Sequence, residues 1–250
     1  GKTLVSKVIA LLFLYVLGVS LIIGTSLTLD QAEEVWDGVV DMTEENDELR
    51  SEVERVSRTN GNKALELTGD RRYKVKAATR KGGRGLSGDL ILLDELREHQ
   101  TWEAWGAVTK TTLARPDALV WCMSNAGDAT SVVLRDLRAK AHIALGDPDG
   151  TFSDAVTDSD LDGVDDDTTL GIFEWSADPT LPIDSDLALR QANPSLGYGL
   201  LTTRALRSAM HTDPEEVFRT ECLCQWVTKS DDTVQPFPEG AWEAGTDPTS

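Results

Sequence analysis

The sequence contains little cysteine and few aromatic residues. Three of its 250 residues are cysteine, and aromatic side chains make up 6% of the chain, although seven of them are tryptophan. Cys122, Cys222 and Cys224 fit neither the spacing of a zinc site nor a disulfide framework, which indicates a protein of a reducing, intracellular compartment. With 40% hydrophobic residues, the chain can bury one large core, or one core and a small appendage.

Basic residues are missing from one region of the sequence, and acidic residues are missing from another. Residues 147–186 hold thirteen aspartates or glutamates and no lysine or arginine, whereas residues 71–85 hold seven basic residues and no acidic one. The formal net charge of −19 therefore describes neither region. Local patches, not the net charge, decide what the protein contacts, so nucleic acid is not excluded as a partner.

Within the acidic region, one stretch matches the first half of a calcium-binding loop. Asp158, Asp160, Asp162 and Gly163 occupy positions one, three, five and six of that pattern. Thr169, however, stands at the twelfth position, where a bidentate glutamate is required. The composition favours a solvated insertion, and a calcium site is the alternative.

No apolar run is continuous enough to predict a membrane span. The strongest candidate, residues 8–24, is interrupted by Gly18 and Ser20, and no small-residue cleavage site follows it. We expect a helix that ends near Gly18 and then a strand, rich in β-branched residues, within residues 20–28. We therefore predict no membrane association, with a membrane anchor as the alternative.

The first three residues, Gly1, Lys2 and Thr3, match the end of the phosphate-binding pattern G-x-x-x-x-G-K-[ST]. They stand at the start of a long apolar helix, where that pattern belongs. Backbone N–H groups at the helix N-terminus would face the phosphates, Lys2 would neutralise the β- and γ-oxygens, and the Thr3 hydroxyl would ligate Mg²⁺. The alternative is an exposed lysine followed by a threonine cap.

Two adjacent carboxylates, Asp94 and Glu95, follow the short apolar segment LILL. A nucleotide site on a parallel sheet places a carboxylate at the C-terminal end of a buried central strand. We expect Asp94 to hold Mg²⁺, directly or through a water, and Glu95 to orient or deprotonate the water that attacks the γ-phosphate. The alternative is a strand end followed by the acidic first turn of a helix.

A second apolar strand, within residues 118–128, ends in the small polar residues SNAG. Ser124 and Asn125 are placed to sense the γ-phosphate, and Gly127 allows a sharp backbone turn afterwards. A simple turn without a role in catalysis is the alternative.

Residues 28–56 predict a helix that begins with a Thr28–Gln31 capping box and is broken near residues 44–47. Its approximate apolar stripe consists of Ala32, Val35, Val39, Met42, Leu49, Val53 and Val56.

The other segments continue an alternation of strands and helices. We predict a strand over residues 73–79, a flexible loop over 81–89, and helices over 101–115 and 131–145. This alternation is typical of a three-layer α/β domain with a mostly parallel central sheet. Near the C-terminus, Cys222 and Cys224 alternate on a predicted strand, where we expect them to be packing residues.

The order of these motifs resembles the ATPase domain of large terminases, the DNA-packaging motors of tailed bacteriophages. The resemblance rests on GKT, on T-x-x-Q-A from residue 28, on RG-x-x-x-D-L-I-L-L-D-E from residue 84, and on SNAG. The later stretches GIFEWSADPTLPID, RQANPSLGYGLLTTRAL and FRTECLCQWV are also similar to the segment that leads toward the nuclease in actinobacterial phage terminases.

The resemblance implies a fold and a role for each motif. The fold would be that of an ASCE-type P-loop NTPase with a small C-terminal linker or lid segment. Lys2 and Thr3 match the Walker A end, Asp94 and Glu95 match the Walker B pair, and residues 124–127 match the coupling motif. Arg84 matches the arginine thought to reach a neighbouring subunit's nucleotide. A basic loop that contacts DNA phosphates is the alternative for Arg84.

The resemblance also implies an organisation for the chain. Residues 1–145 would form the ATPase core, residues 146–186 an acidic insertion, and residues 187–250 the C-terminal part of the ATPase domain with a linker. We expect the first strand and glycine-rich loop of the core to precede Gly1, and the nuclease domain to follow the given sequence.

The resemblance further implies cofactors and partners. ATP and Mg²⁺ would bind at the site. Double-stranded viral DNA, the small terminase subunit and the portal protein would be partners of a homo-oligomeric ring on the procapsid, in the cytoplasm of the infected bacterium. The alternatives are another P-loop motor, such as a helicase, or a non-enzymatic membrane-anchored or calcium-binding module.

Overall fold

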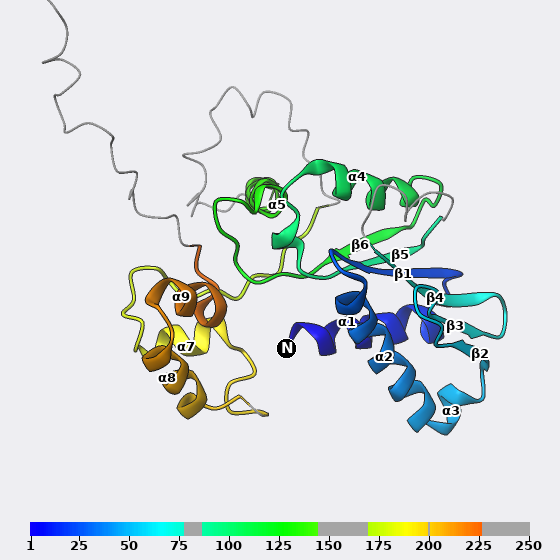
Figure 1. Cartoon of the computed structure of the whole chain (residues 1–250), viewed down its shortest axis with the longest axis horizontal. Coiled ribbons are helices and arrows are strands. Elements are labelled where there is room, and N and C mark those ends of the chain that lie inside the picture. The colour runs from blue at the N-terminus through cyan, green and yellow to red at the C-terminus, as the bar shows by residue number, and fades with distance from the viewer. Residues whose placement is uncertain (78–86, 145–169, 200, 227–250) are drawn as a thin grey trace, which may run out of the picture.

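The computed structural model describes residues 1–77, 87–144, 170–199 and 201–226 (Figure 1). Its centre is a six-stranded sheet with the strand order β2-β3-β4-β1-β5-β6. The four neighbours β4, β1, β5 and β6 run parallel, whereas β2 and β3 are antiparallel to their neighbours. The strand bounds are β1 Leu21–Ser26, β2 Val53–Ser57, β3 Ala64–Leu67, β4 Arg71–Ala77, β5 Leu90–Leu93 and β6 Leu119–Cys122. The predicted α/β class with a mostly parallel sheet is confirmed.

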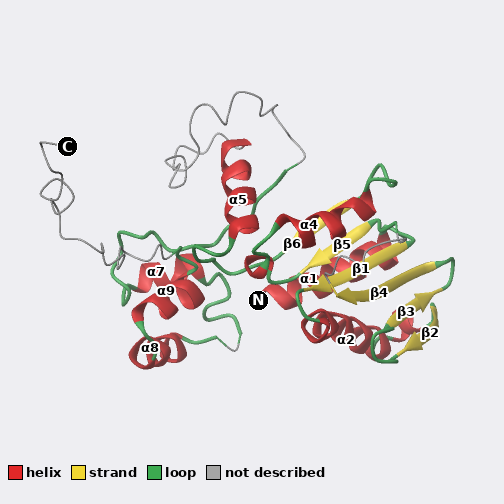
Figure 2. Cartoon of the chain, turned by 45° about the horizontal axis from the view of Figure 1, so that its top comes forward, coloured by secondary structure: helices red, strands yellow, loops and turns green. Residues whose placement is uncertain are grey.

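Helices cover both faces of the sheet (Figure 2). Side chains alternate between the faces along each strand, so Ile22 and Leu90 join one apolar cluster while Ile23 and Ile91 join the other. One face packs against α1 (Lys2–Leu11), its π-helical extension η1 (Leu12–Val16) and α2 (Leu29–Glu45), and the other packs against α4 (Trp102–Thr109) and α5 (Val132–Ala144). The two apolar faces explain why β5 is buried along its whole length.

A separate group of short helices follows the acidic region. Helices α7 (Asp186–Ala192), α8 (Thr203–Thr212) and α9 (Glu215–Leu223) share an apolar cluster around Leu189, Phe218 and Leu223, all of them buried. In both Figure 1 and Figure 2, the N-terminus of the chain lies between the sheet and this α7–α9 group. The start of α1 therefore lies on the side of the core that faces the C-terminal helices.

The apolar run over residues 8–24 forms a helix and a buried strand. Helix α1 and η1 end at Val16, Gly18 adopts a left-handed φ of 66°, and β1 begins at Leu21. This confirms the predicted helix end and strand. No helix within the described ranges combines the length and the hydrophobicity that crossing a bilayer requires.

The prediction for residues 28–56 is confirmed in its first part and wrong in its last. Thr28 caps α2 by accepting a hydrogen bond from the Gln31 N–H at 3.5 Å, and the helix breaks at Asn46, where the short helix α3 (Asp47–Arg50) begins. Val53 and Val56, assigned to the helical stripe, lie instead in β2. The spacing of three between these valines fits a helix, but pairing with β3 determines their conformation.

The predicted strand at Cys222 and Cys224 is also wrong. Cys222 lies in the last turn of α9, and Cys224 ends that helix in the left-handed region with φ 50°. The helix forms because Phe218 and Cys222, four residues apart, lie on one of its faces and pack, together with Leu223, into the apolar cluster of the α7–α9 group. Helices are confirmed within residues 101–115 and 131–145, as α4 and α5, although a 3₁₀ turn, η3 (Lys110–Thr112), follows α4.

Candidate active site

Two of the predicted site residues, from distant parts of the chain, contact each other. Lys2 begins α1, and Glu95 follows β5, yet Lys2 Nζ lies 2.6 Å from Glu95 Oε1. The side chains are 32% and 20% exposed, so the pair is partly shielded from water but remains accessible. A ligand of high negative charge can therefore reach the lysine and compete with the carboxylate for it.

The N-terminus of α1 offers hydrogen-bond donors. Gly1 is its N-cap residue, no side chain of the described residues caps the helix, and the first turn contains no acidic residue. The positive end of the helix dipole therefore lies beside the Lys2 ammonium. Thr3, in the same first turn, is half-buried. An uncapped helix end, an ammonium group and a hydroxyl are the chemistry that binds a polyphosphate.

Asp94 lies at the C-terminal end of β5, beside β1. Its N–H donates to the carbonyl of Thr25 at 3.0 Å, and its carbonyl accepts from the Ser26 hydroxyl at 3.1 Å. Burial raises the pKa of the Asp94 carboxyl, and the nearby Glu95 carboxylate adds to this effect, whereas the Glu95 N–H and the Lys2 charge oppose it. A divalent cation near this carboxylate would oppose the raised pKa by favouring its charged form.

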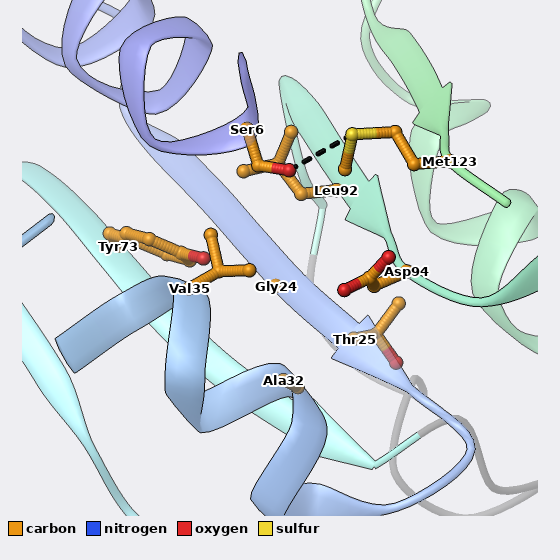
Figure 3. A pocket seen from close by; sticks show the side chains of 9 residues that line it. All are labelled: Ser6, Gly24, Thr25, Ala32, Val35, Tyr73, Leu92, Asp94 and Met123. Carbon is orange, nitrogen blue, oxygen red and sulfur yellow. Dashed lines mark hydrogen bonds between the residues drawn. The ribbon is translucent and has the colours of Figure 1, made fainter. Parts of the chain in front are cut away.

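A small cavity of about 10 Å³ lies beneath Asp94, bordered by Gly24, Thr25 and Tyr73 (Figure 3). The hydroxyls of Thr25 and Tyr73 are buried, and neither has a hydrogen-bond partner among the described residues. On its other side, the Ser6 hydroxyl of α1 lies 3.0 Å from the sulfur of Met123. This contact joins α1 to the residue that follows β6, at the same cavity that Asp94 lines.

Glu95 has an unusual backbone conformation, with φ 52° and ψ 54°. A left-handed residue other than glycine, asparagine or aspartate is uncommon, and such strain recurs at functional sites. The Glu95 N–H donates to Asp94 Oδ1 at 3.0 Å, so the backbone of this turn holds the Asp94 carboxyl group. A 3₁₀ turn, η2 (Leu96–Glu98), follows directly in place of a long helix.

Structural comparison finds large terminases among the similar solved structures. The chain aligns with the HK97 bacteriophage large terminase at 20% identity and a TM-score of 0.71, over 90% of this chain and 44% of that one. It aligns with the large terminase ATPase domain of Thermus phage P74-26 at 17% identity and a TM-score of 0.59, over 91% of this chain and 84% of that one. An R-to-A variant of the same domain gives 16% identity and 0.58, with 91% and 85% covered.

This chain has the large terminase ATPase fold. The P-loop NTPase fold that the sequence resemblance implies is therefore confirmed. The chain spans less than half the length of the HK97 large terminase. No protein-family model and no curated protein sequence matches it.

Within this fold, the residues that follow β6 contact the turn after β5 and helix α9. The Ser124 hydroxyl accepts from the Arg97 N–H at 3.0 Å, and Asn125 Nδ2 donates to Glu221 Oε2 at 2.8 Å. A Cβ at Gly127 would lie 2.4 Å from the Ser131 side chain, so the backbone passes that residue where only glycine fits. The structure thus places Ser124 and Asn125 beside the turn that carries Glu95.

Other predicted site residues lie outside the described residues. Arg84 falls within residues 78–86, and the calcium-loop pattern falls within residues 145–169. Among the residues that are described, no group of three or more histidine, cysteine, aspartate or glutamate side chains could hold a metal ion. Magnesium in a nucleotide site needs only one or two carboxylates besides the phosphate oxygens, and Asp94 fits that role.

Arg97 contacts Glu95, and Glu221 contacts Arg97, but the sequence predicts neither residue as part of the site. Arg97 Nε lies 3.1 Å from Glu95 Oε2, and Arg97 Nη1 donates to Glu221 Oε1 at 2.5 Å. An arginine two residues after an acidic pair carries no local signal of this role, and Glu221 is 124 residues further along the chain. Only the folded arrangement brings them together.

Proposed function

We propose that this chain is the ATP-hydrolysing region of a terminase motor subunit that moves double-stranded viral DNA into procapsids. The observation that supports it best is the 2.6 Å contact between Lys2 and Glu95, at an uncapped helix N-terminus and beside Asp94. The large terminase ATPase fold adds support, and in the sequence resemblance Lys2 matches the Walker A end and Asp94 and Glu95 match the Walker B pair.

In this proposal, Lys2 and the first N–H groups of α1 bind the β- and γ-phosphates of ATP. Thr3 and Asp94 hold Mg²⁺, which supplies charge neutralisation and orientation of the phosphate oxygens when bound. Glu95 accepts a hydrogen bond from the attacking water and takes its proton as the water oxygen bonds to the γ-phosphorus. The bond to the bridging oxygen breaks, and the products are ADP and phosphate.

The remaining roles follow from the family resemblance. Arg84 completes the site of a neighbouring subunit in a homo-oligomeric ring, where a guanidinium stabilises the charge of the transferred phosphoryl group. Ser124, Asn125 and Gly127 report the state of the γ-phosphate to the segments that follow. The partners are the DNA, the small terminase subunit and the portal protein, in the host cytoplasm, and nuclease activity resides elsewhere in the full-length protein.

ATP turnover by the full-length protein tests the proposal. Glu95→Gln keeps the size of the side chain but removes the base, and we expect kcat to fall by about 10²-fold or more. Glu103→Gln, an exposed carboxylate in the first turn of α4, serves as the matched control and should leave kcat unchanged. Full turnover by the Glu95→Gln protein would remove the assignment.

A further inference from the structure

Arg97 joins the candidate catalytic glutamate to the C-terminal helices. Its guanidinium lies between two carboxylates, with Nε 3.1 Å from Glu95 Oε2 and Nη1 2.5 Å from Glu221 Oε1. Glu95 follows the central strand β5, and Glu221 lies on α9, in the separate α7–α9 group. The Arg97 side chain, only 20% exposed, therefore connects the two parts of the molecule beside the site.

The turn that carries Arg97 is also held by residues 123–125, the segment that directly follows β6. The Leu96 N–H donates to the Met123 carbonyl at 3.1 Å, and the Arg97 N–H donates to the Ser124 hydroxyl at 3.0 Å. Asn125 then donates to the second oxygen of Glu221 at 2.8 Å. Glu221 thus accepts one hydrogen bond from Arg97, in the turn after Glu95, and one from Asn125, in the segment after β6.

Arg97 and Glu221, the two residues that join the core to α9, are both charged. Burial lowers the pKa of Arg97, but the hydrogen bond and charge of Glu221, with the charges of Glu95 and Glu98, outweigh it and raise the pKa overall. Burial raises the pKa of Glu221, but the hydrogen bonds from Arg97 and Asn125 outweigh it and lower that pKa. The pair is partly buried, where a charge-assisted hydrogen bond is stronger than on an open surface.

The contact between Arg97 and Glu95 is of a different kind. Glu95 Oε2 and Arg97 Nε are both buried, and neither makes a hydrogen bond within the described residues, although they lie at ion-pair distance. The charge of Arg97 therefore holds the Glu95 carboxylate at Oε2, next to a left-handed backbone. A residue that acts on a water molecule needs such a fixed position.

We propose that Arg97 is a positioning residue that fixes Glu95 for attack on ATP and ties it, through Glu221, to helix α9. This inference rests on the proposed function. It makes the docking of the α7–α9 group against the core a requirement for fast hydrolysis. When α9 is docked, Glu221 holds the guanidinium in place. When α9 moves away, Arg97 loses that anchor and Glu95 loses its fixed position.

The test measures kcat at saturating Mg-ATP and the Kd for a non-hydrolysable ATP analogue, both with the full-length protein. For Arg97→Gln, we expect kcat to fall about 10- to 100-fold because Glu95 is misplaced, while Kd stays within about threefold. For Glu221→Gln, we expect a smaller fall of about three- to tenfold, since Arg97 remains. In the double variant, kcat should stay within about twofold of the Arg97→Gln value, because both changes act through one connection.

Arg207→Gln is the matched control, because Arg207 pairs with Asp186 on the surface of the same helical group, at 3.1 Å and with both side chains more than half exposed. It should leave kcat unchanged. If Arg97→Gln does not fold, Arg97→Lys replaces it. A lysine keeps the charge but cannot contact both carboxylates with a planar fork, so kcat should still fall at least about threefold.

Several results would overturn the inference: a normal kcat in the Arg97 variant used, an equal loss in the control, or losses that multiply in the double variant. These failures are distinct from failure of the proposed function. If Glu95→Gln abolishes turnover while Arg97→Gln leaves it intact, only the role of Arg97 is refuted. If Glu95→Gln leaves turnover intact, the proposed function itself is refuted.

Discussion

Replacing Glu95 with glutamine should tighten the binding of Mg-ATP to the full-length protein while turnover is lost. In the structure, Lys2 Nζ is paired with Glu95 Oε1 at 2.6 Å, so a phosphate must replace that carboxylate as the partner of the lysine. The pair is partly exposed, and pairs of that kind contribute about 0.2–1 kcal/mol. If the variant no longer has to break the pair, Kd for a non-hydrolysable analogue should fall by up to about fivefold.

Isothermal titration of the wild type, Glu95→Gln and the control Glu103→Gln measures this effect. Glu103 is an exposed carboxylate on α4, so its removal should change Kd by less than about twofold. Weaker binding by Glu95→Gln than by the control would contradict the idea that a phosphate displaces this carboxylate from Lys2.

Three further predictions concern the core around the site. A Cβ at Gly24 would lie 2.6 Å from the Tyr73 hydroxyl, so Gly24→Ala should destabilise the fold by about 1–3 kcal/mol in urea denaturation. Gly106→Ala, in a helix with open space at that position, should instead stabilise it by up to about 1 kcal/mol, and the opposite order would refute the packing argument. Tyr73→Phe removes a buried hydroxyl without a partner among the described residues, so stability should be unchanged or slightly higher, and a loss above about 1 kcal/mol would reveal a hidden hydrogen bond. His99 is 1% exposed with neither ring nitrogen hydrogen-bonded within the described residues, and burial lowers its pKa. As the pH falls, His99 is therefore protonated in the unfolded chain before it is protonated in the folded protein. The contribution of neutral His99 to the free energy of unfolding is complete above pH about 6.5 and decreases below it, by up to about 1.4 kcal/mol per pH unit. His99→Leu should flatten this slope, whereas a slope equal to that of the exposed-residue control His211→Gln would contradict it.

The parts of the site that the sequence predicted are those with a local signal. The segment before Asp94 is apolar at every position because helices cover both faces of β5. Asp94 and Glu95 follow the last buried residue of that strand. The GKT triplet predicts the start of an apolar helix, and the structure confirms this, since Gly1 is the N-cap residue of α1 and Lys2 begins the helix. Convergence of Lys2 with Glu95 then follows from the parallel order of β1, β5 and their helices.

The parts that the sequence did not predict depend on contacts between distant segments. Val53 and Val56 fit a helical stripe, and only their pairing with β3 makes them a strand. Cys224 follows a helix because Phe218 and Leu223 have a cluster to pack into. The connection from Arg97 to Glu221 spans 124 residues and uses ordinary surface residue types, so no local pattern distinguishes it.

The most direct test of the account is a structure of the full-length protein with Mg²⁺ and a non-hydrolysable ATP analogue. We predict that the γ-phosphate lies between the Lys2 ammonium and the Glu95 carboxylate, with their 2.6 Å contact opened and the metal beside Asp94. A nucleotide bound elsewhere, with the Lys2–Glu95 contact intact, would contradict the account.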